Sequence, residues 1–169
     1  ISSWSWDFAS NGQSSTAQNP SIIYNSPGSY SATLEITTNN GCKDTVSMPV
    51  DIYPNPTLSL SSTAPSGCSE WCVDFENTST ISDGSIANYN WDFGDGYTSN
   101  QTDPKQCFTN DTWEEIKYDI SLSATSDQGC ITDTLLSEYV TVYPNPEASF
   151  TTSTNSTSMY TPEIEFYDE

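Results

Sequence analysis

Two aspartates in one short segment are the side chains of this sequence best suited to binding a cation. The segment consists of Trp91, Asp92, Phe93, Gly94, Asp95 and Gly96. Hard cations prefer oxygen donors, so Asp92 and Asp95 are candidate Ca²⁺ ligands. Calcium takes about six to eight oxygen ligands, however, and one pair of carboxylates does not supply them. The alternative is structural: the two carboxylates accept backbone N–H groups and stabilise a turn.

Five cysteines are the other residues with distinctive chemistry. Their spacing does not match the C-x₂-C pattern of zinc and redox sites, since Cys68 and Cys72 are four positions apart. Five cysteines in an acidic chain rich in Ser and Thr indicate an oxidising environment outside the cytoplasm. We therefore expect disulfides and an exported protein.

Catalysis finds little support in the residue types. The chain contains no histidine, which excludes the usual serine and cysteine triads and histidine-based zinc sites. Asp and Glu are numerous enough for a glycosidase pair, but carboxylates scattered along strands are typical of a solvated surface. We expect a protein that is not an enzyme.

The charge balance narrows the range of partners. Three Lys and Arg stand against 23 Asp and Glu, which gives a net charge of −20. Such a chain is repelled by nucleic acid and by anionic membranes. No stretch approaches the ~20 apolar residues of a membrane span, so we expect no membrane insertion by this segment. Ile1 does not begin a signal peptide, and we expect any targeting signal outside this sequence.

The Trp-Asp-Phe element has a weaker copy upstream, at Trp6, Asp7 and Phe8. The two tryptophans are 91 − 6 = 85 residues apart, and the later pair Tyr53 and Tyr143 is 143 − 53 = 90 apart. A period near 90 residues fits a tandem array of small β domains better than a solenoid. We predict the C-terminal part of repeat 1 at 1–56, a complete repeat 2 at 57–146, and the N-terminal part of repeat 3 at 147–169. The chain is then a window of a longer repeat protein.

Strands with a two-residue period dominate the pattern. Segments 32–37, 118–124 and 89–93 alternate apolar and polar residues, as half-buried strands do. In the last of these, Trp91 and Phe93 share one face, which we expect to be buried, while Asp92 points away. Gly94 and Gly96 permit the positive φ that reverses the chain. The Pro-Asn-Pro sequences at 54–56 and 144–146 mark short, stiff joints.

These landmarks resemble the PKD domain (polycystic kidney disease repeat), in the variety found in secreted surface proteins of gliding Bacteroidetes. The segment 91–96 is the specific part of the resemblance. The supporting matches are Gly67-Cys68, Phe75–Ser79, Asp103-Pro104, Gly129-Cys130 and Pro144–Pro146. The resemblance implies an all-β chain of tandem Ig-like, seven-stranded β-sandwiches. It leaves Ca²⁺ open as a cofactor, in a partial site near a domain joint that involves Asp51 or Asp92.

The Ig-like topology also implies roles for the cysteines. It makes the strands of Cys72 and Cys107 antiparallel neighbours, so we expect these two to form a disulfide. It places Cys68 at one end of its domain, and Cys42 and Cys130 at the other end of theirs. We therefore expect these three to bridge consecutive domains, with partners outside this sequence. Free buried thiols, or a bridge from Cys68 within its own domain, remain the alternative.

Two Asp-Thr-aliphatic sequences follow the Gly-Cys pairs, at Asp44–Val46 and Asp133–Leu135. They resemble the acceptor by which Bacteroidetes O-glycosylate exported proteins, which makes Thr45 and Thr134 candidate glycosylation sites. The alternative is an Asp-Thr pair that simply begins the last strand of each repeat.

Two classes of function follow from the resemblance. The first is a non-catalytic stalk or filament segment on the surface of a Gram-negative bacterium, as in gliding adhesins exported by type IX secretion. Its partners are neighbouring repeats of the same polypeptide, surface glycans or other cells. The second is a spacer or glycan-contacting module of a secreted hydrolase.

Overall fold

The computed structural model describes residues 1–9, 12–160 and 163–168, and this part of the chain is built from β-strands. Within it, no helix is long and apolar enough to cross a membrane. The strands are β1 (Ser3–Asp7), β2 (Ser14–Ser15), β3 (Gly28–Thr37), β4 (Lys43–Ile52), β5 (Leu60–Ser62), β6 (Ser66–Cys68), β7 (Trp71–Asn77), β8 (Ile86–Asp92), β9 (Thr98–Ser99), β10 (Lys105–Phe108), β11 (Ile116–Ser126), β12 (Ile131–Tyr143), β13 (Phe150–Thr152) and β14 (Phe166–Asp168).

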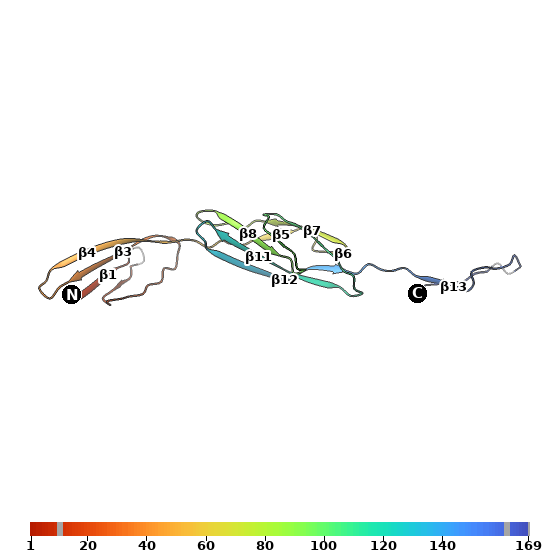
Figure 1. The fold of residues 1–169 in the computed structure, drawn as a ribbon, viewed down its shortest axis with the longest axis horizontal. Coiled ribbons are helices and arrows are strands. Elements are labelled where there is room, and N and C mark those ends of the chain that lie inside the picture. The colour runs from red at the N-terminus through yellow and green to blue at the C-terminus, as the bar shows by residue number, and fades with distance from the viewer. Residues whose placement is uncertain (10–11, 161–162, 169) are drawn as a thin grey trace.

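Residues 57–146, named repeat 2 after the prediction above, form a β-sandwich of two sheets. One sheet has the order β10-β7-β5 and the other the order β6-β12-β11-β8-β9. Figure 1 shows the two sheets face to face in the middle of the molecule. The all-β, Ig-like sandwich expected from the sequence is therefore confirmed.

The strand count differs from the expected seven because the first strand is divided. β5 pairs antiparallel with β7, whereas β6 pairs parallel with β12 in the other sheet. Pro65 lies between them and has no N–H to continue a ladder, but its carbonyl accepts the N–H of Thr141 at 2.9 Å. The chain thus changes sheets at Pro65, and one expected strand becomes two.

The core of repeat 2 lies between the two sheets and is rich in aromatic rings. Trp91 is 0% exposed and Phe93 is 1% exposed, whereas Asp92 between them is exposed, as the two-residue period predicts. β11 alternates in the same way. The buried members of this core are Val73, Phe75, Trp91, Phe93, Phe108, Ile120, Leu122, Val140 and Val142.

The segment predicted as repeat 1 contains one sheet among its described residues, with the order β2-β1-β3-β4. Its register matches the corresponding part of repeat 2: Trp6 pairs with Ser15 and with Leu34, as Trp91 pairs with Ser99 and Leu122. The strands β1, β2, β3 and β4 are thus the counterparts of β8, β9, β11 and β12.

Repeat 3 contributes the hairpin-like pair of β13 and β14. Thr152 pairs with Phe166, as Ser62 of β5 pairs with Phe75 of β7. β13 and β14 are therefore counterparts of β5 and of the end of β7. In Figure 1 they lie at the opposite end of the long axis from β1, β3 and β4.

The turn after β8 packs directly on β11, and this contact requires a glycine. Gly94 has φ of 71°, and a Cβ built there would lie 2.6 Å from the carbonyl oxygen of Asp119. Gly96 has φ of 91°, but a Cβ there would meet nothing within 4 Å. The positive φ favours glycine at both positions. At Gly94 the close approach to Asp119 also leaves no room for a Cβ.

These two glycines provide a matched test of the packed turn. Gly96→Ala should lower the free energy of unfolding by about 1–2 kcal/mol, the cost of a left-handed alanine. Gly94→Ala should cost about 2–5 kcal/mol, because overpacking against Asp119 adds to that strain. Urea unfolding followed by tryptophan fluorescence measures both changes. Equal losses for the two variants would contradict the close approach of this turn to β11.

Candidate functional site at the disulfide and the joint between repeats

A disulfide joins β7 to β10 in the three-stranded sheet. Cys72 and Cys107 stand opposite each other in the antiparallel register and are bonded in the structure, the pair expected from the sequence. The bond closes a loop with a sequence separation of 35, and that loop includes β8 and the turn that follows it. The disulfide therefore encloses the strand that carries Trp91.

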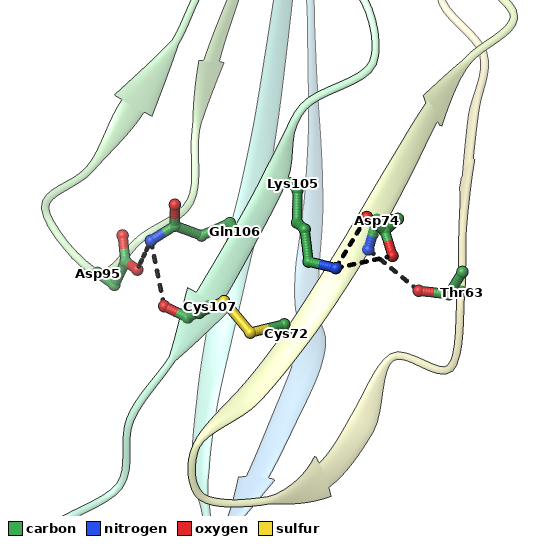
Figure 2. The surroundings of a disulfide bond; sticks show 7 residues. All are labelled: Thr63, Cys72, Asp74, Asp95, Lys105, Gln106 and Cys107. Carbon is green, nitrogen blue, oxygen red and sulfur yellow. Dashed lines mark hydrogen bonds and ion pairs between the residues drawn. A yellow bond between two sulfur atoms is a disulfide. The ribbon is translucent and has the colours of Figure 1, made fainter.

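Polar contacts tie the disulfide strand to the turn after β8 (Figure 2). Gln106 Nε2 donates to Asp95 Oδ2 at 2.7 Å and to the Cys107 carbonyl oxygen at 3.3 Å. On the other side of β10, Lys105 Nζ lies 3.4 Å from the Asp74 carboxylate. This ion pair is exposed and adds little stability. The Gln106 contact joins β10 in one sheet to a turn of the other.

The two candidate calcium ligands have partners within the turn. Asp92 Oδ1 accepts the N–H of Gly94 at 2.9 Å, and Asp95 Oδ1 accepts the N–H of Tyr97 at 2.9 Å. Together with the Gln106 contact, these bonds engage three of the four carboxylate oxygens. The Asp95 charge and partial burial also raise the pKa of the Tyr118 phenol, with burial the larger cause. The geometry is that of a stabilised turn.

Among the described residues, one group of three cysteine or carboxylate side chains lies close enough together to share a metal ion. It consists of Glu70, Cys72 and Cys107. The two sulfurs are bonded to each other, and thiolates rather than disulfide sulfurs are metal ligands. The two cysteines of the group are therefore engaged in the disulfide. Neither Asp92 nor Asp95 belongs to the group.

The weaker motif of repeat 1 keeps the geometry of repeat 2. The rings of Trp6 and Phe8 stack with an interplanar angle of 7°, and those of Trp91 and Phe93 with 8°. Asp7 Oδ1 accepts the N–H of Ala9 at 2.8 Å, as Asp92 accepts that of Gly94. Ala9 has φ of 48°, so the turn conformation remains although the glycine is absent.

The joint between repeats 1 and 2 has buried prolines and one contact across it. Pro54 and Pro56 are both buried, and Cys130 Sγ of repeat 2 lies 4.0 Å from the carbonyl oxygen of Tyr53. An open pocket of about 440 Å³ at the joint is lined from repeat 1 by residues that include Asp51, and from repeat 2 by Asp83. Asp51 Oδ1 accepts the Ser29 hydroxyl at 2.7 Å. The joint after repeat 2 is more open, since Pro146 is exposed.

The three remaining cysteines lie at the ends of the repeats and are free in the structure. Cys42 and Cys130 close equivalent hairpins, where their N–H groups donate to Thr38 Oγ1 and Ser126 Oγ at 3.1 and 3.0 Å. Cys68 pairs with Tyr143, at the far end of β12. β12 has 13 residues, so Cys68 and Cys130 lie about 40 Å apart along it. A bridge between these two within repeat 2 is thereby excluded.

The two glycosylation candidates lie on different faces. Thr45 is exposed and pairs with Glu35. Thr134 is half-buried and pairs with Leu122, a core residue. Thr45 is three residues after Cys42, whereas Thr134 is four residues after Cys130. This difference of one residue places the two threonines on opposite faces of their sheets.

Trp71 and Trp113 of repeat 2 differ from each other in exposure. Trp71 covers Gly67, where a Cβ would meet the ring at 2.0 Å, and its Nε1 donates to the Ala64 carbonyl at 2.9 Å. Trp113 is 76% exposed and lies beside Asp111 and Glu147 in an open pocket of about 210 Å³. Trp71 is a packing residue, and Trp113 is free to contact a ligand.

Removing the disulfide should lower stability without changing the fold. The double substitution Cys72→Ser with Cys107→Ser should reduce the free energy of unfolding by about 4 kcal/mol, because the open chain regains loop entropy in the unfolded state. Cys42→Ser, at an exposed hairpin, is the matched control and should change little. Non-reducing peptide mapping should recover Cys72 and Cys107 as one linked pair. A map that joins Cys72 to Cys68 would contradict the strand placement.

The chain is similar to known proteins over most of its length. It is 32% identical over 132 residues to "Pre-pro-metalloprotease PrtV" of Vibrio cholerae serotype O1 (strain M66-2), which covers 78% of this chain and 14% of that relative. The chain thus spans a small part of the relative's length.

Two solved structures are also similar. The crystal structure of the PKD1 domain from the Vibrio cholerae metalloprotease PrtV has 28% identity and a TM-score of 0.43, and covers 54% of this chain and 99% of that one. The PKD1 domain of Vibrio anguillarum Epp has 25% identity and a TM-score of 0.44, and covers 54% and 96%.

The family model described as "PKD domain" matches residues 1–52 and 55–142. These residues include both Trp-Asp-Phe strands, the disulfide and the sandwich of repeat 2, and they make up more than half of the sequence. The chain therefore belongs to the PKD domain family.

Proposed function

We propose that this chain is a non-catalytic structural segment of a long exported protein, in which PKD repeats follow one another as a stiff stalk or surface filament. The observation that carries the proposal is the packed joint between repeats 1 and 2. A flexible linker would leave its residues solvated, whereas here the joint prolines are buried. A stalk holds its far end at a fixed distance and carries force through such joints. Binding or catalytic sites then lie in other parts of the polypeptide.

The joint combines two sources of stiffness. Pro54 and Pro56 fix their own φ angles, and burial removes them from solvent. The bridge between Thr57 and Thr80 then ties the first residues of repeat 2 to its own sheet. Tyr53 is thus held against the hairpin that carries Cys130. Bending at this joint would separate packed surfaces, which opposes free rotation of one repeat against the other.

The free cysteines suggest that disulfides between consecutive repeats reinforce this joint. In repeat 2, Cys68 is the strand neighbour of Tyr143, and Tyr143 is the counterpart of Tyr53. A cysteine at the Cys68 position of repeat 1 would therefore lie beside Tyr53, which is where Cys130 Sγ already lies. We propose that such pairs form disulfides between consecutive repeats, with the partners of Cys42, Cys68 and Cys130 in sequence outside this segment.

The surface is consistent with an exported setting and a glycan or cellular partner. The net charge of −20 keeps such a chain soluble and away from anionic surfaces. Trp113 offers an exposed ring beside carboxylates, a combination suited to sugar hydroxyls and apolar sugar faces. We place the protein at the surface of a Gram-negative bacterium, with Thr45 as the more accessible glycosylation candidate. Ca²⁺ at the carboxylates of the joint, including Asp51, remains part of the proposal.

A second candidate function is favoured by the similarity to a metalloprotease precursor. In that alternative the repeats are a spacer or glycan-contacting module attached to a secreted hydrolase. The sequence of the gene on both sides of this segment distinguishes the two. Many further repeats support the stalk, whereas a catalytic domain beside one or two repeats supports the accessory module.

Joint stiffness can be measured with one spin label in each of two repeats. Cys42 carries the first label, Leu135→Cys carries the second, and Cys68→Ser with Cys130→Ser removes the other free thiols. We expect a narrow distance distribution by pulsed electron spin resonance, because the joint is packed. Pro54→Gly with Pro56→Gly should broaden it, since both the φ restriction and the burial are lost. A broad distribution before this change would contradict the stalk.

The inter-repeat bridges predict a disulfide map of the parent polypeptide. Non-reducing digestion should recover Cys130 linked to a cysteine of the preceding repeat, and Cys68 linked to one of the following repeat. Reduction should loosen the joints while the sandwiches stay folded, because the bridges lie outside their cores. Free thiols at both positions in protein purified from an oxidising compartment would refute the bridges and leave the packed joint as the only source of stiffness.

A further inference from the structure

A groove on the side of repeat 2 lies between β10, at the edge of one sheet, and the turn after β8 in the other sheet. Its volume is about 520 Å³, within the range of ~300–1,000 Å³ that is typical of ligand sites. All the residues that line it belong to the complete sandwich of repeat 2. They include Asp95, Tyr97, Lys105, Gln106, Thr109 and Tyr118.

The joint between repeats 1 and 2 shows where a following repeat packs. The pocket at that joint is lined by residues 27–29 and 51–54 of repeat 1 and by residues 82–83 of repeat 2. Tyr30 is the counterpart of Tyr118, since each lies four residues before the leucine that pairs with the motif tryptophan. Tyr30 is not among the described residues that line the joint pocket. The groove of repeat 2 is therefore separate from the surface on which a following repeat packs.

Hydrogen bonds hold the walls of the groove in fixed positions. The Tyr97 N–H donates to Asp95 Oδ1 at 2.9 Å, and the Tyr97 carbonyl oxygen accepts the Phe93 N–H at 3.2 Å. Gln106 Nε2 donates to Asp95 and to the Cys107 carbonyl oxygen, so it connects the turn to β10 (Figure 2). A ligand would thus meet a preformed site and would not have to order a loop.

Two tyrosine rings give the groove an apolar component. Tyr97 is 67% exposed, although its backbone is fixed on both sides. Tyr118 is half-buried, with its ring centroid 4.9 Å from that of Phe108, and its hydroxyl donates to the Thr109 carbonyl oxygen at 2.9 Å. Tyrosine rings of this kind provide a large, rigid contact surface at low cost in conformational entropy.

The edge of β10 is poorly suited to a peptide partner. A peptide that adds to a sheet as a further strand must bond to unpaired backbone groups at the edge. The carbonyl oxygens of Cys107 and Thr109 already accept the Gln106 amide and the Tyr118 hydroxyl. An added strand would have to displace both side chains.

Charge also restricts the ligand. Lys105 is an exposed cation that lies 3.4 Å from the Asp74 carboxylate, and the whole chain has a charge of −20, so an anionic ligand would be repelled. Both carboxylate oxygens of Asp95 accept hydrogen bonds from Tyr97 and Gln106, which leaves little support for a cation. A neutral ligand with both hydroxyl groups and apolar faces fits these residues best.

We propose that this groove binds a neutral saccharide chain. Sugar rings have apolar C–H faces that pack on Tyr97 and Tyr118, and hydroxyl groups that bond to the side chains of Lys105, Gln106 and Thr109. The inference rests on the glycan partner of the proposed function and gives that partner a defined site within one sandwich. It does not depend on the stiffness of the joint.

Repeat 1 indicates the most informative substitution. The Gln13 carbonyl oxygen accepts the Phe8 N–H at 3.1 Å, as the Tyr97 carbonyl oxygen accepts the Phe93 N–H. Gln13 therefore stands at the position of Tyr97 in an equivalent turn. The variant Tyr97→Gln places the residue of repeat 1 in repeat 2, so it should remove the exposed ring and keep the backbone of the turn.

Nuclear magnetic resonance with isotope-labelled tyrosine rings tests the proposal. The probes are four neutral oligosaccharides: cellohexaose, maltohexaose, mannohexaose and chitohexaose. We expect at least one of them to shift the ring signals of Tyr97 and Tyr118, while those of Tyr89 and Tyr139, which pack against the core, stay unchanged. Tyr97→Gln should weaken this binding by about tenfold, because a stacking surface is lost. Near-ultraviolet circular dichroism checks that the variant remains folded.

Trp113→Ala is the matched control, because it removes an exposed aromatic ring outside the groove. It should leave the shifts of Tyr97 and Tyr118 unchanged, and an anionic hexagalacturonate should bind more weakly than the neutral probes. The proposal is wrong if no neutral probe shifts these signals at millimolar concentration, or if Trp113→Ala abolishes binding and Tyr97→Gln does not. The second result would keep a glycan partner at Trp113, and neither result bears on the distance distribution that measures joint stiffness.

Discussion

Trp91 of β8 and Phe93, which directly follows β8, both face the core, where the three-stranded sheet of β5, β7 and β10 covers them. Full burial of a phenylalanine side chain contributes about 1.5–3 kcal/mol of hydrophobic stabilisation, and the larger tryptophan ring contributes more. Phe75 of the opposite sheet contacts both rings, with centroids 5.5 and 5.4 Å away. The two sheets of repeat 2 are held together through this aromatic contact.

The polar interactions around this core hold the two sheets in place for the contact of Phe75 with Trp91 and Phe93. The disulfide joins two adjacent strands of the covering sheet, and Gln106 ties that sheet to the turn after β8. Gly94 brings the turn close to β11. Asp92 and Asp95 therefore have a structural task that does not require a cation.

Much of repeat 2 could be predicted from its sequence. The two-residue period identifies the buried face of β8, and the Ig-like resemblance places Cys72 beside Cys107. The pattern did not show that Pro65 divides the first strand, because a proline marks an interruption but not a change of sheet. It also did not show that Ala9 keeps the turn of repeat 1, since alanine rarely adopts positive φ.

The exposure of individual side chains on the surface and at the joint could not be predicted from the sequence, for a physical reason. Thr45 and Thr134 belong to the same Asp-Thr-aliphatic pattern, but Thr45 is three residues after Cys42 and Thr134 is four residues after Cys130. A shift of one residue turns a side chain to the other face of a sheet. Pro54 and Pro56 are buried, whereas proline in a joint is usually exposed, and a local pattern does not distinguish the two cases. Trp113 is exposed whereas Trp71 is packed over Gly67, and the residue type alone does not distinguish the two rings.

Hydrogen–deuterium exchange, measured by mass spectrometry at low protein concentration, tests the central claim that the covered aromatic face holds the molecule together. The account predicts the slowest exchange in β8, β11 and β12, where both sheets enclose the core. The counterparts β1, β3 and β4 should exchange much faster although their ladders are similar, because their apolar face is open. Equal protection of these two sets of strands would contradict the account, since the backbone ladders alone would then be sufficient.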